Sequence, residues 1–150
     1  MTVSRHQRAK PGRDLQYLTL ARSYAEAAMS LGRTGEVADT IRLPFFQLVA
    51  HTMELSLKAA LSFQGRDEED LIGIGHELEW CRRRATRGGM SALEDSKVAS
   101  LIDCLGPPHA RQAFRYPQHF HWPLPDMEAA LHTLAGLLDA VDSYILTSER

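Results

Sequence analysis

Cysteine is scarce in this sequence, and several signatures of common protein classes are missing. The 150 residues include two cysteines, Cys81 and Cys104, and no CxxC pair, so a disulfide framework and a thiolate zinc site are both disfavoured. No run of about 18 apolar residues occurs, so no membrane-spanning helix is expected. The basic N-terminus has no apolar core of a secretory signal. We expect a cytoplasmic protein with reduced thiols and no membrane association.

Charge of one sign is also lacking. The formal net charge is −2 and charged residues make up 24% of the chain, which is ordinary for a globular protein. Any contact with nucleic acid would therefore have to come from a local patch. P-loop, nucleophile-elbow and dinucleotide-binding motifs are absent. The length suits one domain, which we place at residues 13–150 after a flexible tail at 1–12.

Helical periodicity dominates the rest of the chain, and no stretch alternates as a strand does. Proline clusters at residues 106–125 and predicts a long loop there, and residues 66–75 are predicted to form a shorter loop. A capping box at Ser91 and Glu94 is expected to begin the fourth helix. The prediction is an all-α, antiparallel up-down bundle of four to five helices, at about 14–31, 44–64, 76–86, 92–105 and 127–147.

The helix predicted at 44–64 is apolar almost all round, which places it at the centre of the domain. One narrow polar stripe interrupts it, at Gln47, His51, Glu54 and Lys58. If Glu54 and Lys58 are exposed, they form an ordinary i,i+4 ion pair that contributes roughly 0.2–0.5 kcal/mol. The alternative is that His51, Glu54 and Lys58 line a cleft facing the proline-rich loop, because a polar stripe on a central helix needs partners.

Two motifs, spaced at loop distance, point to a family. The segment LVAHTMELSLKAALSFQG contains an E-L-x-L-K core at Glu54–Lys58, and GHELEWCRRRA begins with Gly75–Leu78. Together they resemble the HEPN superfamily, in which an apolar central helix with this core precedes a Gly-His-(Asp/Glu)-Leu helix start. The FRYP stretch, Phe114–Pro117, is similar to one that related bacterial proteins place before their final helix.

This resemblance implies a helical bundle that commonly pairs as a homodimer. Several HEPN branches cleave or bind RNA in toxin–antitoxin and phage-defence systems, and others accompany small nucleotidyltransferases. The ribonuclease branches carry an arginine, four to six residues, and then a histidine, a pattern that Arg115 and His121 fit. An arginine holds a phosphate and a histidine moves a proton near neutral pH, without a metal.

Prolines around Arg115 and His121 make their segment irregular, which favours binding over robust catalysis. The expected function is therefore binding of RNA or of a nucleotidyltransferase-type partner. The alternatives are an active ribonuclease that uses Arg115 and His121 with Glu54, and a non-catalytic dimeric interaction module. The candidate binding residues are His51, Lys58, Arg83, Arg84, Arg87, Arg111, Tyr116 and His119.

Two further groups invite a functional interpretation. The arginines at 82, 83, 84 and 87 form either a solvated helix face, which we favour, or a phosphate-binding patch. His109, His119 and His121 are a conceivable metal set, but no carboxylate stands at ligand spacing, so neither metal nor cofactor is predicted. The helix at 14–31 carries apolar residues on a second face, which predicts a homodimer interface; they are Leu15, Leu18, Leu20, Ala25 and Met29.

Overall fold

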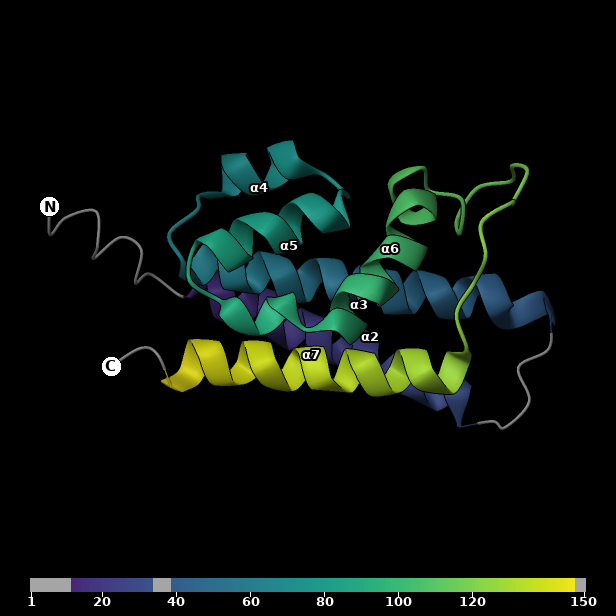
Figure 1. The fold of residues 1–150 in the computed structure, drawn as a ribbon, viewed down its shortest axis with the longest axis horizontal. Helices are drawn as coiled ribbons and strands as arrows, with labels where there is room; N and C mark the ends of the chain where they lie inside the picture. The colour runs from purple at the N-terminus through teal and green to yellow at the C-terminus, as the bar shows by residue number, and fades with distance from the viewer. Residues whose placement is uncertain (1–11, 34–38, 148–150) are drawn as a thin grey trace, which may run out of the picture.

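The computed structural model describes residues 12–33 and 39–147, and within these ranges the protein is all-helical. The predicted tail therefore lies almost entirely outside the described residues. Six α-helices and one 3-10 helix follow one another along the chain (Figure 1): α2 (Arg13–Gly32), α3 (Asp39–Phe63), α4 (Glu68–Ile74), α5 (Leu78–Arg87), η1 (Ser91–Glu94), α6 (Ser96–Ala110) and α7 (Met127–Thr147). None of the described helices is long and apolar enough to cross a membrane.

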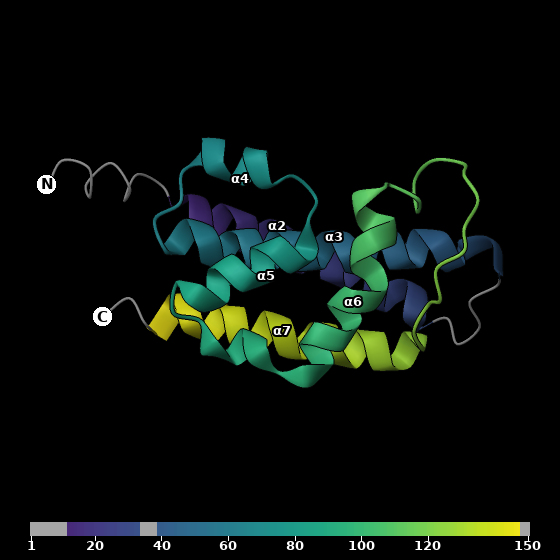
Figure 2. The same ribbon diagram turned by 45° about the horizontal axis from the view of Figure 1, so that its top comes forward.

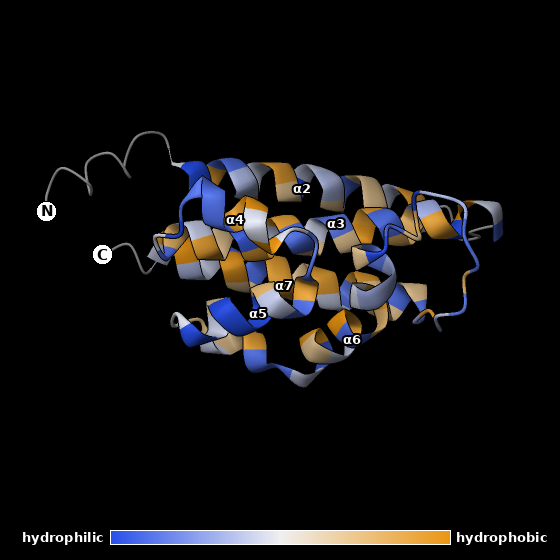
Figure 3. Cartoon of the chain, turned by 90° about the horizontal axis from the view of Figure 1, so that it is seen from above, coloured by the Kyte–Doolittle hydropathy of each residue, from blue (hydrophilic) through white to orange (hydrophobic). Residues whose placement is uncertain are grey.

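Helix α3 is the centre of the packing, as its apolar sequence predicts. It packs against α2, α5, α6 and α7, and α4 touches it near one end. The three longest helices, α2, α3 and α7, run alongside one another, and the shorter α5 and α6 lie across α3 (Figures 1 and 2). Large side chains of α3 fill the core, among them Phe45, Phe46, Met53, Leu57 and Leu61. In Figure 3, α5 is largely blue, whereas α4 shows both blue and orange.

Helix α2 buries two of the five residues that the sequence places on its second apolar face. Its buried residues are Leu18, Ala21, Ala25 and Ala28, so Leu18 and Ala25 belong to the core and not to a second face. The alanines let α2 approach its neighbours closely. Leu15 and Leu20 remain 44% and 46% exposed.

The segment predicted as a loop at 66–75 contains helix α4, so that prediction is wrong. Asp67 caps it by accepting a hydrogen bond from the backbone N–H of Asp70. The first turn is entirely acidic, which suits the positive end of the helix dipole. Gly75, with a φ of 66°, ends α4 and turns the chain toward His76.

The fourth predicted helix begins later and ends later than expected. Residues Ser91–Glu94 form η1, and Asp95 caps α6 by accepting from the N–H groups of Lys97 and Val98. Helix α6 then continues through Pro107 and Pro108 to Ala110. Each proline lacks the N–H that would donate to the carbonyl four residues earlier. The carbonyls of Pro107 and Pro108 nevertheless accept from Arg111 and Ala113, so the chain continues to turn through both residues.

The ends of the two long apolar helices were predicted with unequal success. Helix α7 begins at Met127, after Asp126 caps it through a hydrogen bond to the N–H of Ala129, as predicted. Helix α3 begins at Asp39, so Pro44 lies inside it and not in its first turn.

The cysteines are free thiols, with Cys81 buried and Cys104 half-buried.

Candidate functional site

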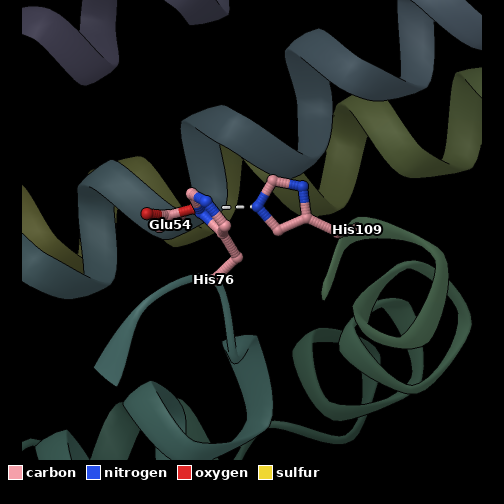
Figure 4. A group of neighbouring side chains, drawn as sticks. All are labelled: Glu54, His76 and His109. Atoms are coloured by element: carbon pink, nitrogen blue, oxygen red, sulfur yellow. Dashed lines mark hydrogen bonds and ion pairs between the residues drawn. The ribbon is translucent and has the colours of Figure 1, made fainter. Parts of the chain in front are cut away.

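Three elements converge on the carboxylate of Glu54 in the centre of the molecule. Glu54 Oε1 accepts from His76 Nδ1 at 3.0 Å and from His109 Nε2 at 2.8 Å, while Oε2 accepts from Lys58 Nζ at 2.9 Å. Figure 4 shows the two imidazoles meeting the carboxylate from separate segments of the chain. These four side chains are called the Glu54 cluster below.

The local structure places each member of the Glu54 cluster. Glu54 and Lys58 lie one turn apart on α3, with side chains 5% and 10% exposed, so their predicted exposure is wrong. His76 lies between α4 and α5, just after the turn at Gly75, and its side chain is 41% exposed. His109 lies in the last turn of α6 and is buried. The cluster therefore joins a central helix to two peripheral ones and opens to solvent at His76.

Electrostatics fix the protonation pattern of the Glu54 cluster. Burial alone would raise the pKa of Glu54, but hydrogen bonds from His109 and Lys58, the Lys58 charge and the His76 hydrogen bond lower it to about 2. An ionised carboxylate accepts hydrogen bonds and donates none. His76 Nδ1 and His109 Nε2 must therefore both carry a proton in this arrangement.

His51 extends the polar stripe of α3 by one turn. Its ring meets that of Tyr24 edge-on, with centroids 4.7 Å apart, and the residue is half-buried. Burial lowers the pKa of His51; the Glu54 charge opposes this shift, and His109, His76 and Arg115 add to it. The predicted cleft-lining residues, His51, Glu54 and Lys58, thus lie together with residues of other elements. Arg115 forms no hydrogen bond or ion pair with Glu54 in the described structure.

The loop after α6 does not bring Arg115 and His121 together. Arg115 is exposed and its guanidinium lies 5.4 Å from the centroid of the Tyr116 ring. His121 stacks on Trp122 and on His119, with centroids 4.1 Å and 5.7 Å apart. No hydrogen bond or ion pair joins Arg115 to His121 within the described residues.

Arg111 and His119 also lie on the surface of this loop. The carbonyl of Arg111 accepts a hydrogen bond from Gln118 Nε2 at 3.1 Å, which closes the loop on itself. His119 is exposed, whereas His109 is buried against Glu54. The three histidines considered as a metal set are therefore divided between the surface and the core.

Intramolecular contacts occupy part of the arginine cluster on α5. Arg82 and Arg83 both donate to Glu79, and Arg82 also donates to the Leu93 carbonyl. The guanidinium of Arg84 lies 4.7 Å from the centroid of the Trp80 ring, and Trp80 is 51% exposed. A pocket of about 280 Å³ lies along this helix, lined by Glu77, Glu79, Trp80, Arg83, Arg84 and Arg87.

The sequence contained weak signals for the contacts it failed to predict. Glu54 belongs to one of the two motifs that carry the family resemblance, and His76 belongs to the other. Their joint occurrence indicates that the two residues lie close together. His109 follows Glu54 by 55 residues and was grouped with His119 and His121 because of their proximity in sequence. The sequence does not predict Trp80 as a binding residue, because a single aromatic residue on an arginine-rich helix has no characteristic spacing.

Comparisons of the chain with protein-family models, with curated proteins and with solved structures find no match.

Proposed function

We propose that this chain is a HEPN-like helical domain of up-down topology that binds single-stranded RNA along the outer side of α5. The exposed Trp80 ring beside Arg84 and Arg87 is the observation that carries the proposal. An aromatic face takes a stacked base of any sequence, and arginines neutralise the phosphates beside it.

Contact between the two family motifs supports the HEPN-like part of the proposal. Glu54, from the E-L-x-L-K core, accepts from His76 of the Gly-His-Glu-Leu start at 3.0 Å. The same carboxylate holds Lys58, the last residue of the core, at 2.9 Å. The motif residues thus have a common structural role, which is to tie α3 to the start of α5.

The charge distribution along α5 favours a narrow binding strip. Glu79 pairs with both Arg82 and Arg83, whereas Arg84 and Arg87 form no ion pair among the described residues. The guanidinium of Arg84 covers one face of the Trp80 ring, which leaves the other face for a base and Arg87 for a phosphate. This arrangement suits one or two nucleotides of a single strand. A duplex would hide its bases from Trp80, so we expect weaker binding of double-stranded RNA.

Fluorescence anisotropy with a labelled single-stranded RNA of about 12 nucleotides tests this proposal. Trp80→Ala should weaken binding about 5- to 150-fold, the usual range for loss of one stacked base. Trp122→Ala, which removes the other tryptophan, is the matched control and should leave the affinity unchanged. Equal affinities for the wild type and Trp80→Ala, or no binding at low salt, would contradict the proposal.

The salt dependence gives a second readout. Arg84→Ala/Arg87→Ala should flatten the dependence of affinity on salt, because fewer counterions are released when the strand binds. Arg33→Ala/Arg42→Ala removes the same charge from exposed positions outside α5 and is the control. If both pairs have the same effect, the attraction is a general charge effect and α5 is not the binding strip.

Binding without robust cleavage is the form of the function that we favour. The Arg115 guanidinium lies against the Tyr116 ring and His121 stacks on Trp122, and no hydrogen bond joins Arg115 to His121 in the described structure. We expect the RNA of the binding assay to stay intact on a denaturing gel without added metal. Rapid cleavage that Arg115→Ala and His121→Ala abolish would instead establish the ribonuclease alternative.

A dimeric interaction module remains the second candidate, and one observation favours it. Leu15 and Leu20 are exposed on α2, beside a shallow groove formed with Gly12, Gln16, Thr19 and Ser23. A second copy of the chain is the simplest cover for such a face. This surface does not include α5, so dimerisation and RNA binding are compatible.

A further inference from the structure

The Glu54 cluster brings three metal-ligating groups together from three separate elements. Glu54, His76 and His109 each offer one ligand atom, and these atoms all lie within 4.8 Å of one another. From the two imidazole nitrogens and the carboxylate oxygen that meet in Figure 4, we propose that these three residues bind one divalent first-row transition-metal ion. This proposal is independent of the RNA-binding surface on α5.

The spacing of the ligand atoms suits such an ion. Glu54 Oε1 lies 3.0 Å from His76 Nδ1 and 2.8 Å from His109 Nε2. Two ligands about 2.1 Å from an ion, at an angle near 90°, lie about 3.0 Å apart. Glu54 Oε1 is therefore spaced to share an ion with each imidazole nitrogen, and the two nitrogens lie within 4.8 Å of each other. Two histidines and one carboxylate are a known ligand set for such ions.

The donor types narrow the choice of ion. Imidazole nitrogen suits zinc, iron, nickel and copper, whereas magnesium and calcium require mainly oxygen ligands. Glu54 has Lys58 on its other oxygen, which holds the carboxylate in one orientation. The Lys58 charge also repels a cation, so we expect a moderate affinity. Water would complete the coordination sphere on the side where His76 reaches solvent.

Binding of the ion replaces the two hydrogen bonds between Glu54 and the imidazoles with three coordinate bonds. Each imidazole changes tautomer: its proton moves, by exchange with solvent, to the other ring nitrogen, which is Nε2 in His76 and Nδ1 in His109. The freed lone pairs of His76 Nδ1 and His109 Nε2 then bind the ion together with Glu54 Oε1. Without an ion, the same groups form a hydrogen-bonded network that joins α3 to α6 and to the start of α5. The two alternatives differ in one measurable property, stoichiometric metal binding that depends on His76.

Isothermal titration calorimetry of the untagged full chain with Zn²⁺, and absorption spectroscopy with Co²⁺, test the proposal. The wild type should bind one equivalent of Zn²⁺ and give visible Co²⁺ bands. His76→Ala should weaken Zn²⁺ binding more than about 100-fold, because a direct ligand matters more than the orienting partners, whose loss costs 10- to 100-fold. Glu54→Gln is a second variant with the same expectation, and circular dichroism checks that both fold.

The control is the double variant His119→Ala/His121→Ala. It removes two exposed, stacked histidines that could bind a metal at the surface and leaves the Glu54 cluster intact. It should bind one equivalent of Zn²⁺ with unchanged affinity. The proposal is overturned if the wild type binds no stoichiometric metal, if His76→Ala binds as the wild type does, or if the control loses binding.

Discussion

At the scale of single residues, the oppositely charged side chains of Glu54 and Lys58 are both almost fully buried. Glu54 keeps its histidine donors if Lys58 is lost, whereas Lys58 would lose its ion-pair partner among the described residues if Glu54 were replaced. Breaking a buried pair by removing one partner typically costs about 3–5 kcal/mol. We therefore expect Glu54→Leu to lower the free energy of unfolding by about that amount, and Lys58→Met to lower it less.

Urea unfolding of the single and double variants measures this difference. Glu54→Leu/Lys58→Met should be more stable than Glu54→Leu, because the second substitution removes the charge left without its partner. A double variant less stable than Glu54→Leu would mean that Lys58 finds another partner. A loss below about 1 kcal/mol in Glu54→Leu would mean that the Glu54 cluster contributes little to the fold.

The two cysteines should differ sharply in reactivity. Burial raises the pKa of the Cys81 thiol to about 12, so almost none of it is thiolate at pH 8. Cys104 is half-buried on α6 and more accessible. One thiol should react rapidly with Ellman's reagent, and Cys104→Ser should remove that reaction. Cys81 should react only after unfolding in urea; loss of the fast reaction in Cys81→Ser would show the assignment to be reversed.

At the scale of elements, the start of α6 provides a clear test of helix capping. Asp95 accepts hydrogen bonds from two backbone N–H groups, whereas Ser91 makes no side-chain cap in η1 or α6. Replacing a capping residue by alanine typically costs about 0.5–2 kcal/mol. Asp95→Ala should lower stability by that amount and Ser91→Ala by less than about 0.5 kcal/mol, as measured by thermal unfolding. The opposite order would place the cap at Ser91.

Long helices were predictable because their apolar periodicity extends over several turns. α2, α3 and α7 were each found within a few residues, apart from the earlier start of α3. α4 was missed because it has only seven residues, and because Gly73 inside it and Gly75 just after it are typical of a loop. The end of α6 was missed because Pro107 and Pro108 indicate a helix stop, although tertiary packing holds them in the last turns.

The sequence predicts the central residue of the candidate site, Glu54, but not the two histidines that contact it. A polar residue on an apolar helix signals that Glu54 needs a partner, and the sequence offered Lys58 at i+4. The contact with His76 spans 22 residues and that with His109 spans 55. Such contacts depend on how α5 and α6 cross α3, which the spacing of residues within one helix does not specify.

At the scale of the whole molecule, the two proposed surfaces belong to different helices. α2 packs against α3 and α7, whereas α5 packs against α3, α6 and η1. The apolar face with Leu15 and Leu20 and the basic strip with Trp80 therefore lie on different helices that share α3 as a support. A homodimer formed through α2 would carry two α5 strips, which would raise the apparent affinity for a strand long enough to reach both.

Association through α2 is the last prediction, and Leu15 and Leu20 are its centre. Burying two half-exposed leucines in a symmetric contact removes apolar surface from water, which favours pairing. Light scattering coupled to gel filtration should give about twice the 16.8 kDa chain mass at micromolar concentration. Leu15→Glu/Leu20→Glu should give the monomer mass. Ile72→Glu on α4, where the side chain is 69% exposed, is the control and should remain dimeric. A wild type of 16.8 kDa would contradict the interface, and a monomeric Ile72→Glu would move it to α4.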